Sequence, residues 1–344
     1  MRFKPLLFKL HTTLGIYLGV LILLQLLSGT VIAFRWELND WLYASSLPTA
    51  ASTARLSAGQ LLENYSRQHP GQHIRRVFFP RTELSPYILQ VTSAQGDSLV
   101  ALDSASGALL QAGGWRQFPV EAALALHAHP LPGLAGLLLV TSTGLLLLSM
   151  IISGLAYGWP RRGRWRSLWQ IRWTPGFRHW GRQLHKALGF ALAPLALLLV
   201  ITGLLIILET LAAQLAASPA PAAVVKNSQL LNATGIDGAV SLAQEKFPAA
   251  QLRDLRLGGE RQVTLQLVTP AQHPWAIDRL RIDTESQEIV SMLLAADNSA
   301  LWMQMLPLHT GALWHWPGRL LMVATAAGLL VLLILGWTIR WRRR

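Results

Sequence analysis

Two apolar stretches of the chain share one layout: QLHKALGFALAPLALLLVITGLL at residues 183–205 and KLHTTLGIYLGVLILLQLLSGTV at residues 9–31. Each has a histidine as its third residue, a glycine four residues after that histidine, and another glycine eighteen residues after it. These positions are His11, Gly15 and Gly29 in one stretch, and His185, Gly189 and Gly203 in the other. About 20 apolar residues span the hydrocarbon core of a bilayer, so both stretches predict transmembrane helices. A histidine in such a helix is a candidate functional residue.

The composition is typical of a membrane protein with additional mass outside the bilayer. Of the 344 residues, 52% are hydrophobic and only 14% are charged. Further apolar runs at about 134–157 and 318–339 bring the number of predicted spans to four. The chain has no cysteine, which excludes disulfides, iron–sulfur clusters and thiolate haem ligands.

The net charge of +13 is concentrated in three short segments. Residues 1–9 hold three of the thirty Lys and Arg residues, residues 160–186 hold eight, and residues 340–344 hold four. Four spans place these segments on one side, which the positive-inside rule makes cytoplasmic. This placement favours contact with membrane lipid and argues against nucleic-acid binding.

The four predicted spans divide the chain into two halves of two spans each, and the second span of each half is also repeated. The segment that begins LHAHPLPG at residue 126 matches the one that begins LHTGALWHWPG at residue 308. His127 precedes Gly154 by 27 residues, and His309 precedes Gly336 by 27 residues. Each half crosses the membrane twice, so these matches indicate a parallel duplication.

The predicted fold is a membrane all-α core of four transmembrane helices, built from two duplicated helix–domain–helix halves, with two small α+β domains. The helices are expected at 1–35, 126–159, 184–210 and 308–344, the last followed by a basic cytoplasmic tail. Residues 36–125 and 211–307 form the two external domains, which lie in the periplasm if the membrane is a bacterial inner membrane. Residues 160–183 form a cytoplasmic loop.

Each external domain has a helical pattern followed by strand patterns. Residues 57–69 begin with a serine N-cap and have helical spacing, and residues 239–247 take the same place in the second domain. Strands are predicted at 87–93 and 262–269, and turns near 104–107 and 284–287.

The cytoplasmic loop is rich in arginine and tryptophan. Trp165, Trp169 and Trp173 are spaced four residues apart and would share one face of a helix. An amphipathic helix at the membrane interface explains this pattern, and a docking surface for an electron donor is compatible with it.

The topology sorts the repeat-matched histidines into two pairs. His11 and His185 lie at the cytoplasmic ends of the first and third helices, and His127 and His309 lie at the outer ends of the second and fourth. Two neutral imidazoles from facing helices can hold a haem iron from its two axial sides. Close-approach positions for a flat porphyrin are Gly15, Gly19, Gly29, Gly189 and Gly203.

Two further histidines are alternative ligands. His129 follows His127 by two residues, and His315 follows His309 by six. Neither has a repeat partner at the same offset, so both rank behind the matched four.

The ordered motifs resemble one family over nearly the whole chain. The LHxxLG…[ST]G helices, the LH…PG openings and the SGLxYxWPRR ending are similar to those of PepSY-associated transmembrane proteins, also described as iron-regulated inner-membrane proteins. Members include ferric-siderophore reductases with two b-type haems. The resemblance implies His11 and His185 as axial ligands of an inner haem, His127 and His309 as axial ligands of an outer haem, and PepSY folds for the external domains.

The second half departs from the first in two places. LHTGALWHWPG has three more residues between histidine and Pro-Gly than LHAHPLPG has, which makes the outer pair the less regular one. Pro194 stands where the first helix has Val20, so we expect a kink in the third helix.

The implied activity is electron transfer to a ferric siderophore or another ferric chelate in the periplasm, which releases ferrous iron. No GxGxxG motif follows a predicted strand, so a membrane quinol or a separate reductase is expected as the electron donor.

Two other functions remain open. One alternative is a haem-free, membrane-anchored PepSY binding protein that regulates peptidases. The other is a metal permease that uses histidines as transient ligands. A permease needs polar groups near the midplane, where the sequence offers only Gln25 and hydroxyls such as Ser28, Thr30 and Thr202.

Overall fold

The computed structural model describes residues 3–44, 56–83, 85–173, 176–216, 232–258, 261–269 and 275–341. The chain divides into two compact units, each built from both halves of the sequence. The helical unit comprises Met1–Ala33, Ala123–Ser218 and Gln304–Arg344. The sheet unit comprises Phe34–Ala122 and Pro219–Met303. Residues 342–344 of the predicted basic tail lie outside the described ranges.

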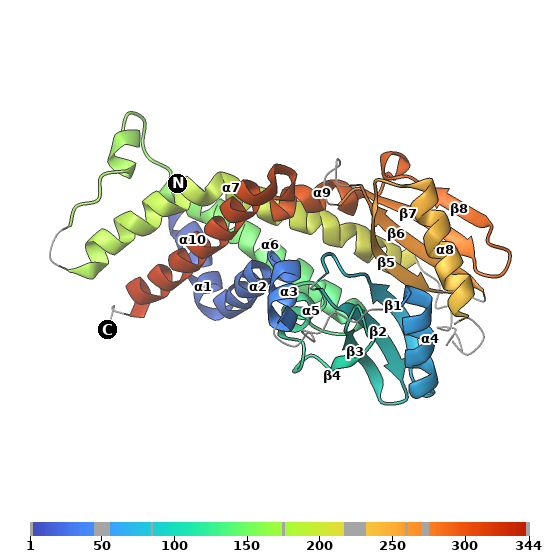
Figure 1. The fold of residues 1–344 in the computed structure, drawn as a ribbon. Coiled ribbons are helices and arrows are strands. Elements are labelled where there is room, and N and C mark those ends of the chain that lie inside the picture. The colour runs from blue at the N-terminus through green and yellow to red at the C-terminus, as the bar shows by residue number, and fades with distance from the viewer. Residues whose placement is uncertain are drawn as a thin grey trace. The chain divides into compact units, whose positions relative to one another are not determined.

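The helical unit contains the membrane-spanning segments. Its long helices are α6 (Gly133–Gly158), α7 (Phe177–Ala216) and α10 (His315–Trp341), and α7 packs against both of the others (Figure 1). Two shorter helices, α1 (Phe3–Tyr17) and α2 (Gly19–Ile32), form a bent pair. Among the described residues, 3 helices are long and apolar enough to cross a membrane, or up to 4 if the bent pair is one span.

A sharp bend lies in the first span. α7 continues through Pro194 as one helix of 40 residues, whereas α1 and α2 meet at Leu18 with an angle of 63°. The bend lies between Gly15 and Gly19, where the indole of Trp337 donates to the carbonyl of Gly15 (2.7 Å). Glycines and a side chain that enters the helical hydrogen-bond ladder are both common causes of bending.

The predicted second and fourth spans are each interrupted near their beginning. A short helix, a break and then the long helix replace the single helices expected at 126–159 and 308–344. The short helices are α5 (Pro119–Ala128) and α9 (Leu301–Thr310), and the second break contains the 3₁₀ turn η4 (Ala312–Trp314). The first break contains Pro130 and Pro132, and the second contains Gly311 with a φ of 74°.

The tryptophan-rich loop does not form the expected amphipathic helix. Between residues 160 and 173 only Trp165–Leu168 is helical, as the 3₁₀ turn η1, and the residues that follow up to Trp173 are irregular. The loop is also shorter than expected, because residues 177–183 already belong to α7. The loop has several arginines and no acidic residue. A helix here would gain no oppositely charged pairs between successive turns.

The sheet unit contains one antiparallel sheet of eight strands in the order β4-β3-β2-β1-β5-β6-β7-β8 (Figure 1). The strands are β1 (His73–Phe78), β2 (Tyr87–Ser93), β3 (Gly96–Leu102), β4 (Leu109–Gly113), β5 (Gln251–Leu257), β6 (Gln262–Val268), β7 (Ile277–Asp283) and β8 (Ile289–Leu293). The strands expected at 87–93 and 262–269 are confirmed to within one residue.

The two expected external domains are therefore joined in one sheet. Each half supplies four consecutive strands, and β1 pairs with β5 through Arg76↔Arg256, Val77↔Leu255 and Phe78↔Asp254. This pairing removes the open edge that each four-stranded half would otherwise expose. The register between distant strands is not encoded in either local pattern, which explains why the sequence pattern missed it.

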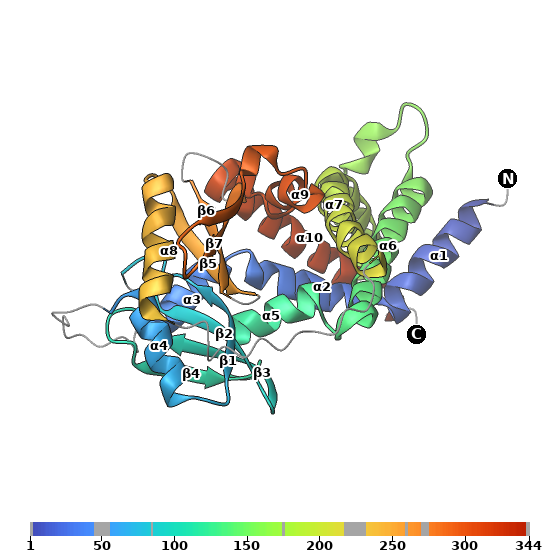
Figure 2. The same ribbon diagram turned by 90° about the vertical axis from the view of Figure 1, so that its right-hand side faces the viewer.

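Two helices, α4 (Ala58–Gln68) and α8 (Ala233–Lys246), cover the same face of the sheet (Figure 2). Ser57 caps α4 as predicted, and the cap forms a capping box with Gln60. The hydroxyl of Ser57 and the amide of Gly59 (2.7 Å) both donate to Asp237 of α8. These contacts join the two halves above a core of alternating strand residues, among them Leu89, Leu255 and Leu265.

The opposite face carries a smaller apolar cluster at one end. This cluster contains Tyr43 of α3 (Arg35–Ala44), Phe78 and Phe118. Elsewhere in the sheet unit, the short turn η3 (Ala295–Asp297) follows the last strand. Arg35 and Glu121 form a buried ion pair beside this cluster (2.8 Å). The rest of this face is polar.

Candidate functional site

The structure brings the repeat-matched histidines together as two pairs inside the helical unit. The rings of His11 on α1 and His185 on α7 have centroids 6.1 Å apart. The rings of His127 on α5 and His309 on α9 have centroids 6.3 Å apart. Each pair therefore takes one histidine from each half of the duplicated chain.

Each imidazole rests against a glycine of the neighbouring helix in its own half. A Cβ atom on these glycines would lie close to Cε1 of the ring. The contacts are Gly154 to His11 (3.0 Å), Gly29 to His127 (2.8 Å), Gly203 to His309 (3.0 Å) and Gly336 to His185 (3.5 Å). Within each half, each of the two transmembrane segments supplies one histidine, and that histidine packs against a glycine of the other segment. This reciprocal packing explains the preserved spacings.

The helical turn that precedes each of these glycines also fixes the orientation of the ring. Nδ1 of three histidines lies within hydrogen-bond distance of the carbonyl four residues before the glycine. These bonds are His11 to Met150 (3.0 Å), His127 to Gln25 (3.1 Å) and His309 to Leu199 (2.9 Å). A carbonyl only accepts, so Nδ1 is the N–H donor and the lone pair lies on Nε2. Nε2 is thus the atom available to bind a metal.

A hydroxyl next to each of these three glycines adds a second contact. Ser153, Ser28 and Thr202 place their oxygen 3.3, 3.3 and 3.2 Å from Nδ1 of His11, His127 and His309. Such secondary hydrogen bonds hold a ligating imidazole in place and tune its basicity.

His185 differs from the other three. Leu335 precedes Gly336, so the hydroxyl is missing. The backbone of Leu332 occupies the equivalent place. Nδ1 of His185 is nevertheless buried without a hydrogen bond of ordinary geometry to any described residue. The four ring environments therefore follow one pattern with a single local exception.

The centroid separation within each pair is close to that of two imidazoles on opposite sides of one iron. A metal–imidazole bond measures about 2.0–2.1 Å and a ring nitrogen lies about 1.1 Å from its ring centroid, so opposite imidazoles on one ion have centroids about 6.2–6.4 Å apart. The separation of His127 and His309, 6.3 Å, lies in this range, and that of His11 and His185, 6.1 Å, is 0.1 Å below it. No group of three or more His, Cys, Asp or Glu residues that could hold a metal ion occurs in the described parts of the chain. Two protein ligands suit a haem, whose porphyrin supplies the remaining four.

The predicted glycines fall into different environments. Gly29 and Gly203 contact imidazole rings, as described above. A Cβ atom on Gly15 would meet the side chain of Met150 (3.0 Å), and one on Gly19 would meet Trp337 (2.9 Å). A Cβ atom on Gly189 would have no neighbour within 4 Å among the described residues.

The structure does not bring the alternative ligands into either pair. His129 is exposed just after the end of α5, and His315 is exposed at the start of α10 with a φ of 51°. The residues missed by sequence reasoning were Gly154 and Gly336 as ring supports, together with the hydroxyls beside the glycines. The sequence did carry a signal for the glycines, because each glycine that contacts a ring lies 18 or 27 residues after a histidine of the repeat.

Comparison with known proteins assigns the chain to a family. No curated protein matches it significantly. The profile of the family described as "PepSY-associated TM region" matches residues 8–344, which include both histidine pairs, the described spanning helices except the first residues of α1, and the whole sheet. With its apolar helices and this match over nearly its full length, the chain is a membrane protein that belongs to the PepSY-associated transmembrane family.

Proposed function

We propose that the protein is a di-haem b electron-transfer protein of the bacterial inner membrane that reduces a ferric chelate, such as a ferric siderophore, in the periplasm. The observation that carries this proposal is the pairing of four histidines at the separation expected for axial ligands of one iron. When bound, the haems would supply reversible one-electron chemistry.

The residues of the chain have three tasks in this function. Nε2 of His11 and His185 would hold the inner haem, and Nε2 of His127 and His309 would hold the outer haem. The carbonyls of Met150, Gln25 and Leu199 keep three of the rings in the required tautomer. The apolar helices around both pairs limit the access of water.

The separation of the two pairs fits a route across the membrane. His185 precedes Gly203, the support of His309, by eighteen residues of the continuous helix α7. At 1.5 Å per residue the two levels lie about 27 Å apart along that helix, close to the hydrocarbon thickness of about 30 Å. One pair at each face would divide the crossing into shorter steps. The positive-inside rule puts the His11–His185 pair on the cytoplasmic side.

The permease alternative is weakened by the state of its polar residues. Gln25 donates to the carbonyl of His127 (2.8 Å). Ser28, Thr30 and Thr202 donate to carbonyls of their own helices at 2.6–2.9 Å. These groups are engaged in local structure and offer no evident ion path. A haem-free PepSY binding protein gives no reason for four imidazoles that meet in two pairs.

The proposal predicts electron delivery across a sealed membrane. Proteoliposomes would contain a reductant inside, and ferric citrate with a ferrous-specific dye outside. We expect ferrous iron outside with the original protein and with His129→Ala, and little with His309→Ala. If haem-loaded protein forms no ferrous iron, or if His309→Ala is as active as the original, the proposed function is wrong.

A further inference from the structure

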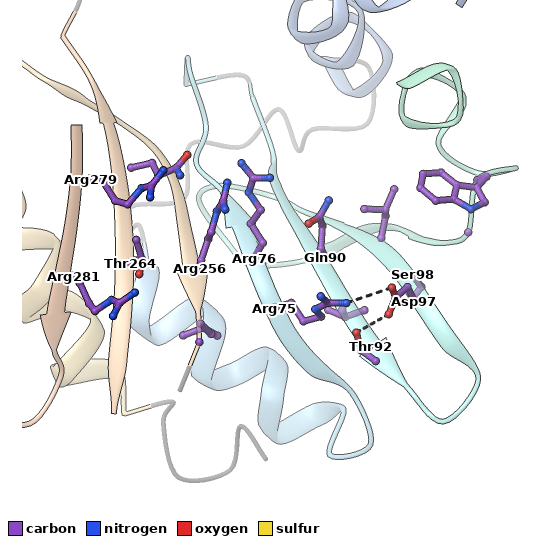
Figure 3. A pocket seen from close by; sticks show the side chains of 17 residues that line it. Arg75, Arg76, Gln90, Thr92, Asp97, Ser98, Arg256, Thr264, Arg279 and Arg281 are labelled. Carbon is purple, nitrogen blue, oxygen red and sulfur yellow. Dashed lines mark hydrogen bonds and ion pairs between the residues drawn. The ribbon is translucent and has the colours of Figure 1, made fainter. Parts of the chain in front are cut away.

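The polar face of the sheet carries an unusual concentration of guanidinium groups. Core residues alternate with side chains on this face, which include Arg76 on β1, Arg256 on β5, and Arg279 and Arg281 on β7. Together with Arg75 they line a cavity of about 700 Å³ on the sheet unit. Figure 3 shows Arg76, Arg256 and Arg279 extending from neighbouring parts of the sheet toward one end of this cavity.

The charges of this cavity are not balanced. Five arginines line it but only one carboxylate, that of Asp97, which pairs with Arg75 (3.4 Å). A second carboxylate, Asp254, lies fully buried beside it. Arg76 contacts Asp254 with two nitrogens (3.0 and 2.8 Å), and Arg256 contacts it with a third (3.2 Å). Nε of Arg253 lies 3.7 Å from the same carboxylate, which thus serves three guanidinium groups.

Arg279 and Arg281 have no anionic partner within the described part of the chain. Nε of the half-buried Arg279 is shielded from solvent and has no hydrogen bond there. Arg281 forms neither a hydrogen bond nor an ion pair with any described residue, and it is exposed toward the cavity (Figure 3). A buried donor without a partner destabilises the fold, so its presence at a cavity points to a ligand that supplies the acceptor.

We propose that this cavity binds a small ligand bearing two or more carboxylates. The guanidinium fork matches a carboxylate with two parallel hydrogen bonds, and Arg76 already holds Asp254 in this way. Gln90, Gln266 and Thr264 add neutral hydrogen-bonding groups to the lining. The volume lies in the usual range for small-molecule sites, about 300–1,000 Å³.

This site rests on the sheet unit alone and does not require haem. If the proposed reductase function also holds, which is a separate condition, the ligand would be a carboxylate chelate of ferric iron. The two proposals can therefore fail independently.

Citrate binding to the full-length protein in detergent tests the site, measured by titration calorimetry. We expect citrate to bind at least tenfold more tightly than acetate, and Arg279→Gln and Arg281→Gln each to weaken citrate about tenfold. Arg67→Gln is the matched control, because Arg67 lies on α4 over the opposite face and pairs with Glu63. It should leave citrate affinity unchanged. Equal thermal transitions of all variants would exclude unfolding as the cause.

Three outcomes would overturn the carboxylate site. These are no citrate binding, equal affinity of the arginine variants and the control, or tighter binding of pyrophosphate than of citrate. Haem content is measured on the same samples. Haem-loaded protein that does not bind citrate contradicts this site only, and haem-free protein that binds citrate contradicts the reductase only.

Discussion

Replacement of Gly29 by alanine tests whether the glycine supports position the imidazoles for metal binding. The new Cβ would lie 2.8 Å from Cε1 and 3.2 Å from Nδ1 of His127. Ordinary contacts begin at 3.4 Å, so the ring has to move by about 0.6 Å. Ligand geometry tolerates displacements of only about 0.5 Å. We expect the outer haem to be lost or to change its axial ligation.

The other supports form a graded series in the same experiment. Alanine at Gly154 or Gly203 would meet its histidine at 3.0 Å and should have a smaller effect. Alanine at Gly336 would make an ordinary contact of 3.5 Å with His185 and should leave both haems in place. The assay is haem per chain together with the electron paramagnetic resonance of the oxidised protein, which reports on axial ligands.

Gly144→Ala is the matched control for a close helix contact without a histidine. Its Cβ would lie 2.7 Å from a methyl group of Leu204, as tight as the contact at Gly29. Alanine is favoured over glycine in a helix by up to about 1 kcal/mol, so helix propensity cannot explain a loss. If Gly29→Ala and Gly144→Ala retain the same haem content and the same resonance, the glycine supports do not position metal ligands.

Three other changes have definite expected results. Leu335→Thr gives Nδ1 of His185 a hydroxyl like those beside the other rings and should lower the midpoint potential of the inner haem in a redox titration. A tenfold change in the one-electron redox equilibrium corresponds to about 60 mV. An unchanged potential would contradict the role of this hydroxyl. Glu121→Gln leaves Arg35, whose side chain is 13% exposed, without its buried partner and should destabilise the sheet unit by about 3 kcal/mol or more, seen as a lower thermal unfolding temperature by tryptophan fluorescence. His129→Ala should retain both haems by pyridine haemochrome assay, because this exposed ring lies outside the pairs.

The sequence repeat was sufficient to predict which histidines meet. Equal spacings in the two halves required equal depths for His11 and His185, and likewise for His127 and His309. Local patterns also predicted the N-cap at Ser57 and the strand at 87–93. These features depend on residues close in sequence or on the duplication itself.

Features that depend on contacts between distant segments could not be predicted. The pairing of β1 with β5 depends on how two sheet edges meet, which neither strand encodes alone. The role of Gly154 and Gly336 required knowing which helix faces pack together. The bend at Leu18 involves Trp337, more than 300 residues away in the chain.

The most direct test of the central claim is a dithionite-reduced minus oxidised visible spectrum of the detergent-purified protein, with haem quantified per chain. Bis-histidine b-type bands at about two haems per chain are expected, with loss of about one haem in His185→Ala and of the other in His309→Ala. A colourless protein from haem-replete cells, or full haem content in both variants, would contradict the assignment of the two histidine pairs as haem ligands.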